Sequence, residues 1–593
     1  MNKSLQRRLR VFSAVVVLVA VMLSARLAWL QIYNYEYYYA RAETNRERKL
    51  QINATRGEIF DVHGELLASN RPGFAVSILD LSSRDASQVI AYLSDLLEMD
   101  EEEITQRIYE ARYRKFAPIR LATDVSPEIV AKIEERRLDL PGVIIETLPV
   151  RHYEYDSLAA HVLGYVGAIS PEQKKQADAQ NVYYHVTDYH GQSGVELTWE
   201  QYLRGKDGIL SVEVNSYGRR TRVLDREEPE AGHDLHLTLD ARLQEISERV
   251  LAEIFEQLQE NGNTQAEKGA VVAIDPHTGG ILAMVSYPAY NPNKITKDSV
   301  FYNRAIQGGY PVGSTYKMVG AMGALEEELI TERSIVTCTG SRRFFRYEDP
   351  RGCYGGTVHG SLNVVSALAK SCNIFFFEMG QRLGAERLYD YGESFGFSRL
   401  TGLLDLQGER EGSLESRTGG YILNAAIGQG HVITPLQLAN YGAILANGGT
   451  RYRPYLVQRA VDHTGSVVIE TEPEIMDQLE YSEKNWDIVK KGMEAVTMPG
   501  GTASIMRDLP VKVAAKTGSA QAGEGIISHS LFVGYAPAEA PAIAIAVIVE
   551  RGGLGSQGAV PVANRILAEY YAPPVEEEAE NPVLGPTSGP ENE

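Results

Sequence analysis

Three short motifs in the C-terminal half of the chain combine residue types that can carry out nucleophilic catalysis. The first is Ser314-Thr315-Tyr316-Lys317. Residues three apart on a helix share one face, so the Lys317 amine can reach the Ser314 hydroxyl. A lysine partly desolvated at this position can lose its proton near neutral pH and activate the serine. The motif alone is a weak signal, because four-residue patterns of this kind also arise by chance.

The second motif, Ser371-Cys372-Asn373, follows a helical run from Val364 to Lys370. A hydroxyl at Ser371 can pass protons between lysine, serine and leaving group, and the Asn373 amide can hold a peptide carbonyl. An ordinary corner between two helices would have the same sequence pattern.

The third motif, Lys516-Thr517-Gly518-Ser519, comes after the strand-like residues 511–515. One interpretation is a strand that ends in a turn. The other is an edge strand whose lysine and hydroxyls bind a carboxylate while its backbone docks an extended peptide by strand addition. Together and in this order, the three motifs strongly indicate acyl transfer through a serine.

The elements that must position these motifs form an α+β pattern. Asp240 caps a helix predicted over residues 241–258, and two strands at 269–275 and 281–286 are joined by a tight turn. A hairpin followed by many helices predicts an antiparallel sheet flanked by helices.

The N-terminus predicts a membrane helix. Four basic residues, the last of them Arg10, precede an apolar stretch from Val11 to Leu30, which is about the 20 residues that a span needs. The basic flank predicts a cytoplasmic N-terminus and an external remainder. A signal peptide cleaved after Ala25 is the alternative, but apolar residues continue beyond that point and favour the anchor.

The composition excludes several classes of protein. The chain has 593 residues, a hydrophobic fraction of 44% and 78 acidic against 58 basic residues, a net charge of −20. The hydrophobic fraction predicts folded domains with hydrophobic cores. The negative net charge argues against electrostatic binding of nucleic acid. Three cysteines exclude a scaffold built on disulfides. The predicted divisions are a cytoplasmic segment 1–10, a transmembrane helix 11–32, an irregular charged domain 33–234, a catalytic domain 235–572 and a disordered acidic tail 573–593.

The chain resembles a class B penicillin-binding protein, a single-pass cell-wall transpeptidase, over nearly its whole length. Val312 departs from the proline that the family often has before Gly-Ser. Besides the three motifs, the resemblance rests on residues 56–64 with 67–70, 191–196 with 203–205, 303–305, 428–430 with 434–437, and 501–503. It implies an elongated pedestal of the dimerisation type over 33–234 and a penicillin-binding transpeptidase domain over 235–572. Within class B, residues 194–197 and 203–205 and the cysteine-rich segment look more like penicillin-binding protein 2 of the cell-elongation machinery than the division enzyme.

The resemblance also implies roles for the motif residues. Ser314 would attack the penultimate D-alanine carbonyl of a stem peptide and form an acyl-enzyme that a neighbouring stem-peptide amine resolves. Lys317 would be the base, Ser371 the proton relay and Asn373 a substrate clamp, although the identity of the acylation base stays open. Lys516 and the substrate-binding residues Thr517, Gly518 and Ser519 would hold the terminal carboxylate. β-Lactams would acylate the same serine.

All three cysteines, Cys338, Cys353 and Cys372, lie close together in the sequence around His359. Four such ligands could form a closed tetrahedral zinc site. A Cys338–Cys353 disulfide with Cys372 buried, or three free thiols, are the alternatives. Catalysis itself requires no cofactor, so any zinc would be structural.

Two other classes of function remain open. A non-catalytic β-lactam receptor or a scaffold that regulates a glycosyltransferase partner would suit a large external body, but the motifs are complete. A D,D-carboxypeptidase or β-lactamase-like hydrolase shares the motifs but has no need of the anchor or the long N-terminal domain.

The resemblance places the protein in the bacterial cytoplasmic membrane with its catalytic domain on the outer face. The implied partners are stem peptides of the lipid-linked precursor polymer, a glycosyltransferase of the SEDS family, other elongation proteins and β-lactams.

Overall fold

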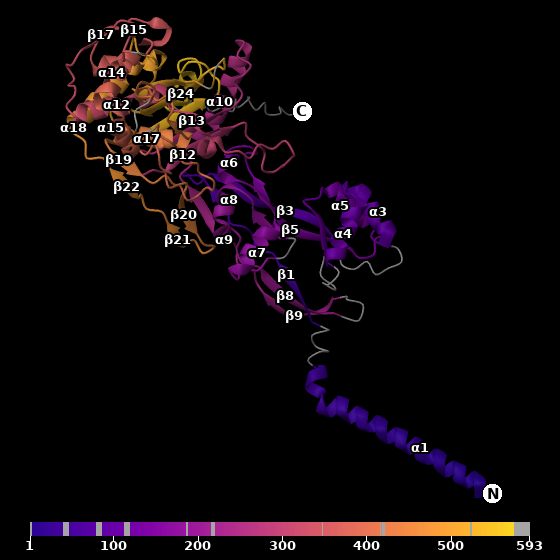
Figure 1. The fold of residues 1–593 in the computed structure, drawn as a ribbon. Coiled ribbons are helices and arrows are strands. Elements are labelled where there is room, and N and C mark those ends of the chain that lie inside the picture. The colour runs from indigo at the N-terminus through magenta and orange to yellow at the C-terminus, as the bar shows by residue number, and fades with distance from the viewer. Residues whose placement is uncertain are drawn as a thin grey trace, which may run out of the picture.

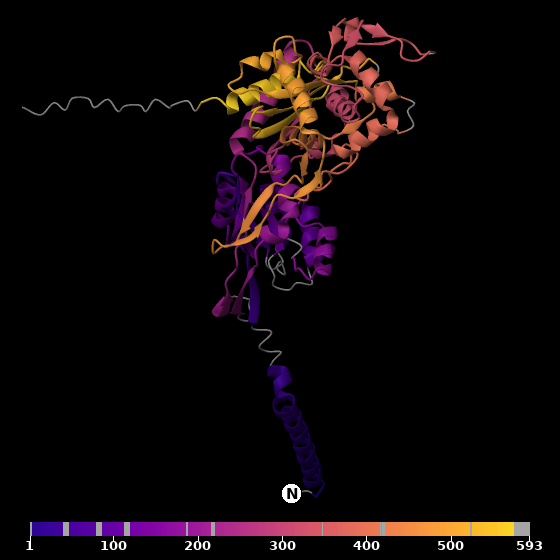
Figure 2. The same ribbon diagram turned by 90° about the vertical axis from the view of Figure 1, so that its left-hand side faces the viewer.

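The computed structural model describes residues 3–39, 47–78, 86–111, 119–184, 188–214, 220–346, 348–415, 417, 421–521, 523 and 525–573. The molecule is elongated, with a helical rod at one end, a mixed domain in the middle and a larger domain at the far end (Figures 1 and 2). We call the middle part the pedestal and the far part the catalytic domain. The predicted acidic tail lies outside the described residues from residue 574 onward.

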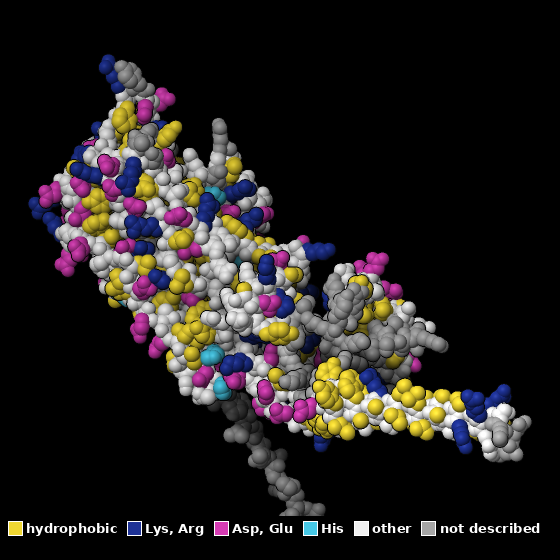
Figure 3. Space-filling model, turned by 60° about the horizontal axis from the view of Figure 1, so that its bottom comes forward, with side chains coloured by type: hydrophobic (Ala, Val, Ile, Leu, Met, Phe, Trp, Pro, Cys, Tyr) yellow, Lys and Arg dark blue, Asp and Glu magenta, His cyan; other side chains and the backbone are white. Residues whose placement is uncertain are grey.

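The rod is the N-terminal helix α1 (Lys3–Ala28), which continues through a π-helical turn at Trp29–Tyr33. The 30-residue helix from Ser4 to Tyr33 is long and apolar enough to cross a membrane, and none of its apolar window is buried. Hydrophobic side chains cover the rod, and lysine and arginine gather at its end (Figure 3). The span predicted over residues 11–32 falls inside this helix.

The pedestal is organised around a seven-stranded sheet with the strand order β21-β20-β10-β2-β3-β4, in which β5 also pairs with β3. The strands β3 (Leu66–Ile78) and β5 (Val143–Tyr153) form a long antiparallel ladder from Ala68↔Tyr153 to Ile78↔Val143. A small helical lobe packs at one end of this ladder (Figure 1). The lobe consists of α3 (Ala86–Leu97), α4 (Glu101–Ala111) and α5 (Pro127–Glu135), beside β4 (Ile119–Thr123).

One strand joins the pedestal to the catalytic domain. β10 (Asp234–Leu237) pairs in parallel with β2 (Ile59–Phe60) and antiparallel with β20 (Val457–Val461), which continues to β21 (Val467–Glu470). The domain boundary expected at residue 235 therefore lies inside a strand. One neighbour of this strand comes from near residue 60 and the other from near residue 460. Pairing of distant segments on both sides of one strand makes the two domains share a sheet.

The remaining pedestal elements lie nearer the rod and the domain junction. They are β1 (Glu47–Ile52), β8 (Gly208–Val214) and β9 (Arg220–Glu227) in one sheet, the pair β6 (Val166–Ala168) and β7 (Tyr189–Gly191), and the helices α6 (Ala160–Leu163), α7 (Pro171–Ala179), α8 (Gly194–Thr198) and α9 (Glu200–Leu203).

The catalytic domain contains a five-stranded antiparallel sheet with the order β12-β11-β25-β24-β23. The strands are β11 (Gly269–Ile274), β12 (Ile281–Tyr287), β23 (Ala514–Ala520), β24 (His529–Ala536) and β25 (Ile543–Val549). Successive residues of β11 point to opposite faces, so Val271 and Ala273 join one core while Val272 and Ile274 join another. Both faces are buried, which confirms the predicted sheet flanked by helices.

Helices cover the two faces of this sheet. Asp240 begins α10 (Ala241–Glu260) as predicted, since its Oδ1 accepts a hydrogen bond from the N–H of Leu243 at 2.9 Å. α10 packs with α19 (Ala559–Tyr570) on one face, and α17 (Pro435–Asn447) packs on the other. The helices around the predicted motifs are α12 (Lys317–Glu326), α13 (Val364–Ala369), α14 (Asn373–Leu383), α15 (Ala385–Ser394) and α18 (Glu483–Thr497).

Short elements complete the catalytic domain. They are α11 (Arg304–Gln307), α16 (Ile422–Ala426), the pairs β13 (Tyr310–Pro311) with β18 (Val432–Ile433), β14 (Val336–Cys338) with β17 (Gly360–Leu362), β15 (Ser341–Arg342) with β16 (Arg351–Gly352) and β19 (Thr450–Tyr452) with β22 (Ile475–Gln478), and 3₁₀ turns at Gly313–Tyr316, Tyr354–Gly356 and Ser504–Asp508.

Candidate active site

Ser314 lies in a single 3₁₀ turn, Gly313–Tyr316, immediately before α12. Gly313 has a φ of +54°, and its N–H donates to the carbonyl of Gly428 at 3.0 Å. A Cβ on Gly428 would lie 2.1 Å from the Gly313 oxygen, so only glycine permits this approach. Gly428, which the sequence only matched to the family, therefore shapes the turn that presents Ser314.

Lys317 begins α12, and its side chain is fully buried. Its Nζ lies 2.7 Å from Asn373 Oδ1, 3.1 Å from Ser371 Oγ and 2.8 Å from the Ser371 carbonyl oxygen. Within the described residues, Ser314 Oγ makes no hydrogen bond, so the direct Ser314–Lys317 contact suggested by the spacing is not formed. The Lys317 amine instead forms its hydrogen bonds with Ser371 and Asn373 of the second motif.

Ser371 occupies the corner between α13 and α14, with a φ of +53°. This left-handed backbone is uncommon outside glycine and indicates a constrained position. Its Oγ lies 3.1 Å from Lys317 Nζ and 3.0 Å from Lys516 Nζ. One hydroxyl thus joins the lysines of the first and third motifs.

Burial sets the electrostatics of this cluster. It lowers the pKa of Lys317 to about 7, because desolvation penalises the ammonium. Burial, and then the charge of Lys317, lowers the pKa of Lys516 well below its usual range. Two ammonium groups on one hydroxyl are costly in a buried site, so at least one lysine favours the neutral form near neutral pH. A neutral buried lysine is a suitable general base.

The Asn373 side chain is engaged at both ends. Its Oδ1 accepts from Lys317, and its Nδ2 donates to the carbonyl of Gly352 at 3.2 Å. The amide therefore ties the base to the segment that carries Cys353. A peptide carbonyl could be held by Nδ2 only in exchange for the bond to Gly352.

The third motif lies on β23, the edge strand of the five-stranded sheet, as predicted. Lys516 is fully buried, and Thr517 Oγ1 forms a 2.8 Å hydrogen bond with Thr502 Oγ1. A Cβ on Gly518 would lie 3.1 Å from a side-chain carbon of Thr315, so glycine allows β23 to approach the nucleophile turn. Ser519 Oγ accepts a hydrogen bond from the N–H of Gly555 at 3.0 Å.

Sequence reasoning gave no role to Thr502. Its N–H donates to the Ala369 carbonyl at the end of α13, while its hydroxyl bonds to Thr517. It therefore links the second motif to the third. The signal available in the sequence was the Gly501-Thr502-Ala503 match.

The cysteine and histidine side chains predicted to cluster do so beside the catalytic corner. The Sγ atom of Cys353 lies 3.7 Å from the Sγ atoms of both Cys338 and Cys372, and Cys338 Sγ lies 3.5 Å from His359 Nδ1. All four possible ligand atoms lie within 4.8 Å of one another. Ligands of a tetrahedral zinc ion, at ~2.3 Å for sulfur and ~2.0 Å for nitrogen, are separated by about 3.5–3.8 Å. The donor set and its spacing fit a closed zinc site.

The alternative Cys338–Cys353 disulfide is not present, because all three cysteines are free. Their sulfur atoms are 3.7 Å apart, whereas bonded sulfurs lie at ~2.05 Å. Cys353 is equally close to both other thiols, so the geometry singles out no pair. Cys372 is fully buried.

The site as a whole defines a class of enzyme: a serine acyltransferase in which buried lysines and a second serine manage the proton. The edge strand β23 lies next to the nucleophile, and an extended peptide can add to it by strand pairing. The fold adds a membrane-type helix and a pedestal to that catalytic unit.

Comparison with known proteins agrees with this class. The model described as "Penicillin binding protein transpeptidase domain" matches residues 269–570, and the one described as "Penicillin-binding Protein dimerisation domain" matches residues 51–237. The chain is 33% identical to the peptidoglycan D,D-transpeptidase MrdA of Acinetobacter baumannii, over 93% of this chain and 86% of the relative.

Two solved structures extend the comparison to the fold. A complex between penicillin-binding protein 2 and MreC from Helicobacter pylori is 26% identical with a TM-score of 0.72, and covers 88% of this chain and 98% of that chain. A structure titled "Structural coordination of polymerization and crosslinking by a peptidoglycan synthase complex" is 28% identical with a TM-score of 0.70, and covers 96% of this chain and 99% of that chain.

The chain belongs to the penicillin-binding protein transpeptidase family, and it has the pedestal of class B members. Its relatives and structural neighbours confirm the predicted likeness to penicillin-binding protein 2 and the predicted serine-type transpeptidase.

Proposed function

We propose that this protein is a membrane-anchored peptidoglycan D,D-transpeptidase that cross-links stem peptides during cell elongation. The observation that carries the proposal is that two buried lysines, Lys317 and Lys516, share the hydroxyl of Ser371. Lys317 lies one helical turn after Ser314 in the chain. The family membership and the MrdA relatives support the same reaction.

In the acylation step, Ser314 Oγ attacks the penultimate D-alanine carbonyl of the donor stem peptide. Lys317, neutral because of its lowered pKa, accepts the serine proton. Ser371 relays a proton to the nitrogen of the breaking peptide bond. The products are the Ser314 ester and free D-alanine.

In the second step, the amine of an acceptor stem peptide attacks the ester carbonyl. The new peptide bond forms, the amine loses a proton to the same lysine–serine relay, and Ser314 regains its hydroxyl proton. Backbone N–H groups of Ser314 and Ser519 stabilise the oxyanion in both steps. The close approach of β23 to the turn at Gly313 supports this arrangement, since a Cβ on Gly313 would lie 3.1 Å from the Ser519 oxygen.

The donor peptide docks along β23. Its terminal carboxylate binds to Lys516 and to the hydroxyls of Thr517 and Ser519, and Asn373 holds its backbone after exchanging its bond to Gly352. The open edge of an antiparallel sheet supports this mode of peptide binding.

A structural zinc ion would be held by Cys338, Cys353, His359 and Cys372. It would supply a rigid cross-link beneath the Ser371–Asn373 corner and take no part in the reaction. The separations of the four ligand atoms support this assignment. One equivalent of zinc per chain, in full-length protein purified without chelator, is expected from elemental analysis, and a substoichiometric content would overturn the assignment.

The protein is anchored in the bacterial cytoplasmic membrane by α1, with its catalytic domain outside. The basic residues that precede the apolar stretch support this orientation. We propose a SEDS-family glycosyltransferase, which polymerises the strands that this protein cross-links, as the partner of the pedestal and α1. The neighbours solved with MreC and in a peptidoglycan synthase complex support an assembly of this kind.

The proposal is tested first by intact mass of the full-length chain in detergent, with and without benzylpenicillin. Ser314→Ala is the test variant, and Ser466→Ala, in an exposed hairpin, is the matched control. A long-lived adduct of one drug per chain, lost only in Ser314→Ala, is expected. Rapid drug turnover would show a hydrolase instead.

A cross-linking assay on nascent peptidoglycan completes the test. Wild type and Ser466→Ala should form cross-linked dimers and release D-alanine, and Ser314→Ala should do neither. An adduct without cross-linking would identify a β-lactam receptor, and neither activity would identify a scaffold.

A further inference from the structure

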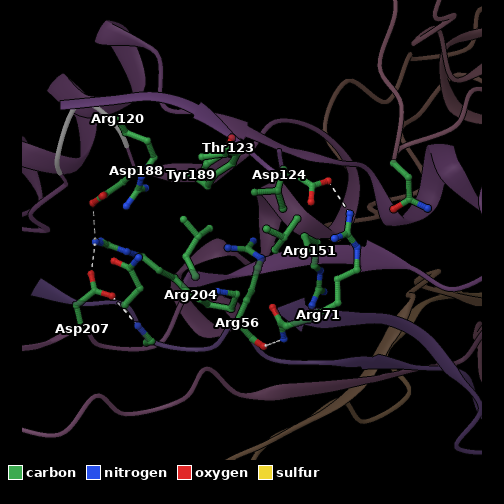
Figure 4. A pocket seen from close by; sticks show the side chains of 18 of the residues that line it. Arg56, Arg71, Arg120, Thr123, Asp124, Arg151, Asp188, Tyr189, Arg204 and Asp207 are labelled. Carbon is green, nitrogen blue, oxygen red and sulfur yellow. Dashed lines mark hydrogen bonds and ion pairs between the residues drawn. The ribbon is translucent and has the colours of Figure 1, made fainter. Parts of the chain in front are cut away.

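Two parts of the molecule bury polar side chains that take no part in the steps of acyl transfer. In the pedestal, a cavity of ≈ 250 Å³ is lined by arginines of several segments (Figure 4). Arg56 and Arg151 in its wall both pair with Glu196 at 2.6 Å, so their charges are already compensated. In the catalytic domain, the histidine His431 is buried directly against the turn that carries Ser314.

Both ring nitrogens of His431 form hydrogen bonds. Its Nδ1 accepts from the N–H of Glu415 at 2.8 Å, and its Nε2 lies 3.1 Å from the carbonyl oxygen of Ala425 in α16. Because a backbone N–H only donates and a carbonyl oxygen only accepts, the proton of the ring is on Nε2 and Nδ1 carries none. The two bonds fix both the tautomer and the orientation of the imidazole.

The environment keeps this imidazole neutral. The side chain of His431 is 2% exposed, and burial lowers its pKa to about 4. Protonation would also place an Nδ1–H opposite the N–H of Glu415, where two donors would face each other. The ring is therefore a fixed hydrogen-bonding group near neutral pH, and not an acid or base of the reaction.

The ring packs on a residue of the first motif. Its centroid lies 4.3 Å from that of Tyr316, which stands between Ser314 and Lys317 in the chain. Tyr316 is fully buried, and its hydroxyl donates to the carbonyl of Leu388 at 2.8 Å. The imidazole is thus part of the wall against which the nucleophile turn rests.

The loop 428–431, of which His431 is the last residue, also holds the backbone of this turn. The N–H of Val312 donates to the carbonyl of His431, and the N–H of Gly313 donates to the carbonyl of Gly428, both at 3.0 Å. These two N–H groups belong to the residues directly before the nucleophile. The position of the loop therefore sets the position of the turn.

The two ends of the loop 428–431 are anchored differently. At its start, the N–H groups of Gly428 and Gln429 donate to carbonyls of α16. At its end, the side chain of His431 bonds to α16 and to the N–H of Glu415. Two of the four loop residues are glycines, which leave the backbone free to move unless contacts restrain it. The imidazole supplies that restraint at the end nearest Val312.

We propose that His431 is a positioning residue for acyl transfer at Ser314. Its imidazole fixes the loop 428–431 in place, and the loop holds the backbone that presents the Ser314 hydroxyl to the substrate. Attack on a carbonyl needs the reacting atoms ~3–3.5 Å apart and aligned, and a misplacement of about 1 Å can cost ~10²-fold in rate. The inference rests on the proposed function, because it concerns the reaction of Ser314.

The test is acylation of the full-length chain by benzylpenicillin in detergent, followed by intact mass over time at several drug concentrations. Each time course gives a first-order rate constant, which refers only to molecules that become acylated. Its dependence on drug concentration separates the rate at saturation from the half-saturating concentration. Misplacement of Ser314 lowers the rate at saturation, whereas weaker drug binding raises the half-saturating concentration.

Two variants of His431 are compared. His431→Phe keeps a ring against Tyr316 but removes both hydrogen bonds, and it leaves the N–H of Glu415 without this acceptor. His431→Asn retains an acceptor near the position of Nδ1 and so keeps the bond to Glu415. Thermal unfolding shows whether each variant folds, and His431→Asn keeps the test available if His431→Phe does not fold.

His161→Phe is the matched control. His161 is also buried, with its Nε2 2.8 Å from the carbonyl oxygen of Val300 and its ring edge-on to Tyr290. Burial lowers its pKa to about 4, as it does for His431. Because His161 belongs to α6 of the pedestal, its replacement should cost stability without moving the turn that carries Ser314.

The rate at saturation is expected to fall about 10- to 100-fold in His431→Phe and less in His431→Asn, with an unchanged half-saturating concentration. His161→Phe should lower the unfolding temperature and keep the wild-type rate. A wild-type rate in His431→Phe, an equal loss of rate in His161→Phe, or a change in the half-saturating concentration alone would each overturn the inference, while the adduct would still uphold the proposed function. A wild-type chain that forms no adduct would overturn the proposed function and this inference with it.

Discussion

The active site and the pedestal both bury charged side chains, but they treat the charge in opposite ways. In the pedestal, Arg56 lies 2.6 Å from both Glu196 and Glu200, and Arg151 lies 2.6 Å from Glu196. In the active site, Lys317 and Lys516 share the neutral Ser371 hydroxyl and form no ion pair within the described residues.

The pKa values show the consequence of this difference. Burial alone would lower the pKa of Arg56, but Glu196 and Glu200 raise it well above its usual range. Burial lowers the pKa of Lys317 to about 7, and Cys372 and Cys353, rather than carboxylates, oppose this shift only in part. A buried guanidinium thus stays charged where carboxylates surround it, and a buried lysine becomes a base where carboxylates are absent.

Replacing Lys317, the proposed base, should have the largest effect: it should slow acylation. Lys317→Ala is expected to slow acylation by benzylpenicillin roughly 10²–10⁴-fold, because it removes the proton acceptor. The rate is measured by intact mass over time. Lys512→Ala, an exposed lysine paired with Glu539 close to β23, should leave the rate unchanged. An unchanged rate in Lys317→Ala would show that another group is the base.

Removing the charge of Glu196 in the pedestal should lower the stability of the protein and leave the chemistry at Ser314 intact. Glu196→Gln leaves two buried arginines short of a partner and is expected to lower the free energy of unfolding by about 3–5 kcal/mol. The measurement is denaturant unfolding of the full-length chain. Glu230→Gln, which breaks an exposed ion pair with Lys206, should have no measurable effect. Equal stability of the two variants would show that the buried pairs of Glu196 with Arg56 and Arg151 do not stabilise the pedestal more than an exposed pair does.

The cysteine cluster tests whether the active site has a structural support of its own. Cys338→Ala is expected to lose the zinc ion and about 2.7 kcal/mol of stability where the free metal is at 100 times its dissociation constant. Elemental analysis and thermal unfolding measure the two effects. His463→Ala, an exposed histidine in the hairpin that follows β20, should keep both the metal and the stability. Full zinc content in Cys338→Ala would exclude this ligand set.

The pH dependence of acylation follows from the lowered pKa of Lys317. The neutral amine is the active form, so the rate should rise about tenfold per pH unit below pH 7 and level off above it. Acylation rates from about pH 5.5 to about pH 9 measure the profile. A flat profile over this range would contradict a lysine base with a pKa near 7.

The smallest expected effect on acylation comes from breaking the hydrogen bond between Thr502 and Thr517 of the third motif. Thr502→Val removes the hydrogen bond to Thr517 Oγ1, and the loss of one such bond, about 1 kcal/mol, should slow acylation about fivefold. Thr464→Val, in an exposed turn, is the control. A loss as large as that of Lys317→Ala would mean that Thr502 does more than position β23.

Much of the fold and of the catalytic set could be predicted from local patterns. Asp240 as a helix cap, the all-buried strand β11 and the apolar helix from Lys317 each depend on residues near one another in the chain. The same is true of the N-terminal helix, since length and hydropathy suffice to define a span. The three motifs were found because their spacing and order are distinctive.

Other features depend on contacts between distant segments. The pairing of β10 with both β2 and β20 joins residues near 60 and near 460, and no local pattern specifies it. The role of Gly428 becomes visible only when its loop meets the turn at Gly313. The close approach of Cys338, Cys353, His359 and Cys372 likewise becomes visible only from the positions of these side chains in the folded chain.

The sequence by itself determined the chemical groups: a serine, two lysines, a second serine and an amide, in an order that identifies the family. Only the tertiary structure decided their state. It placed both lysines on one hydroxyl in a buried site without a carboxylate, and it gave the equally buried arginines of the pedestal their counterions. A side chain's charge depends on the dielectric and the charges around it, and those come from residues far away in the chain.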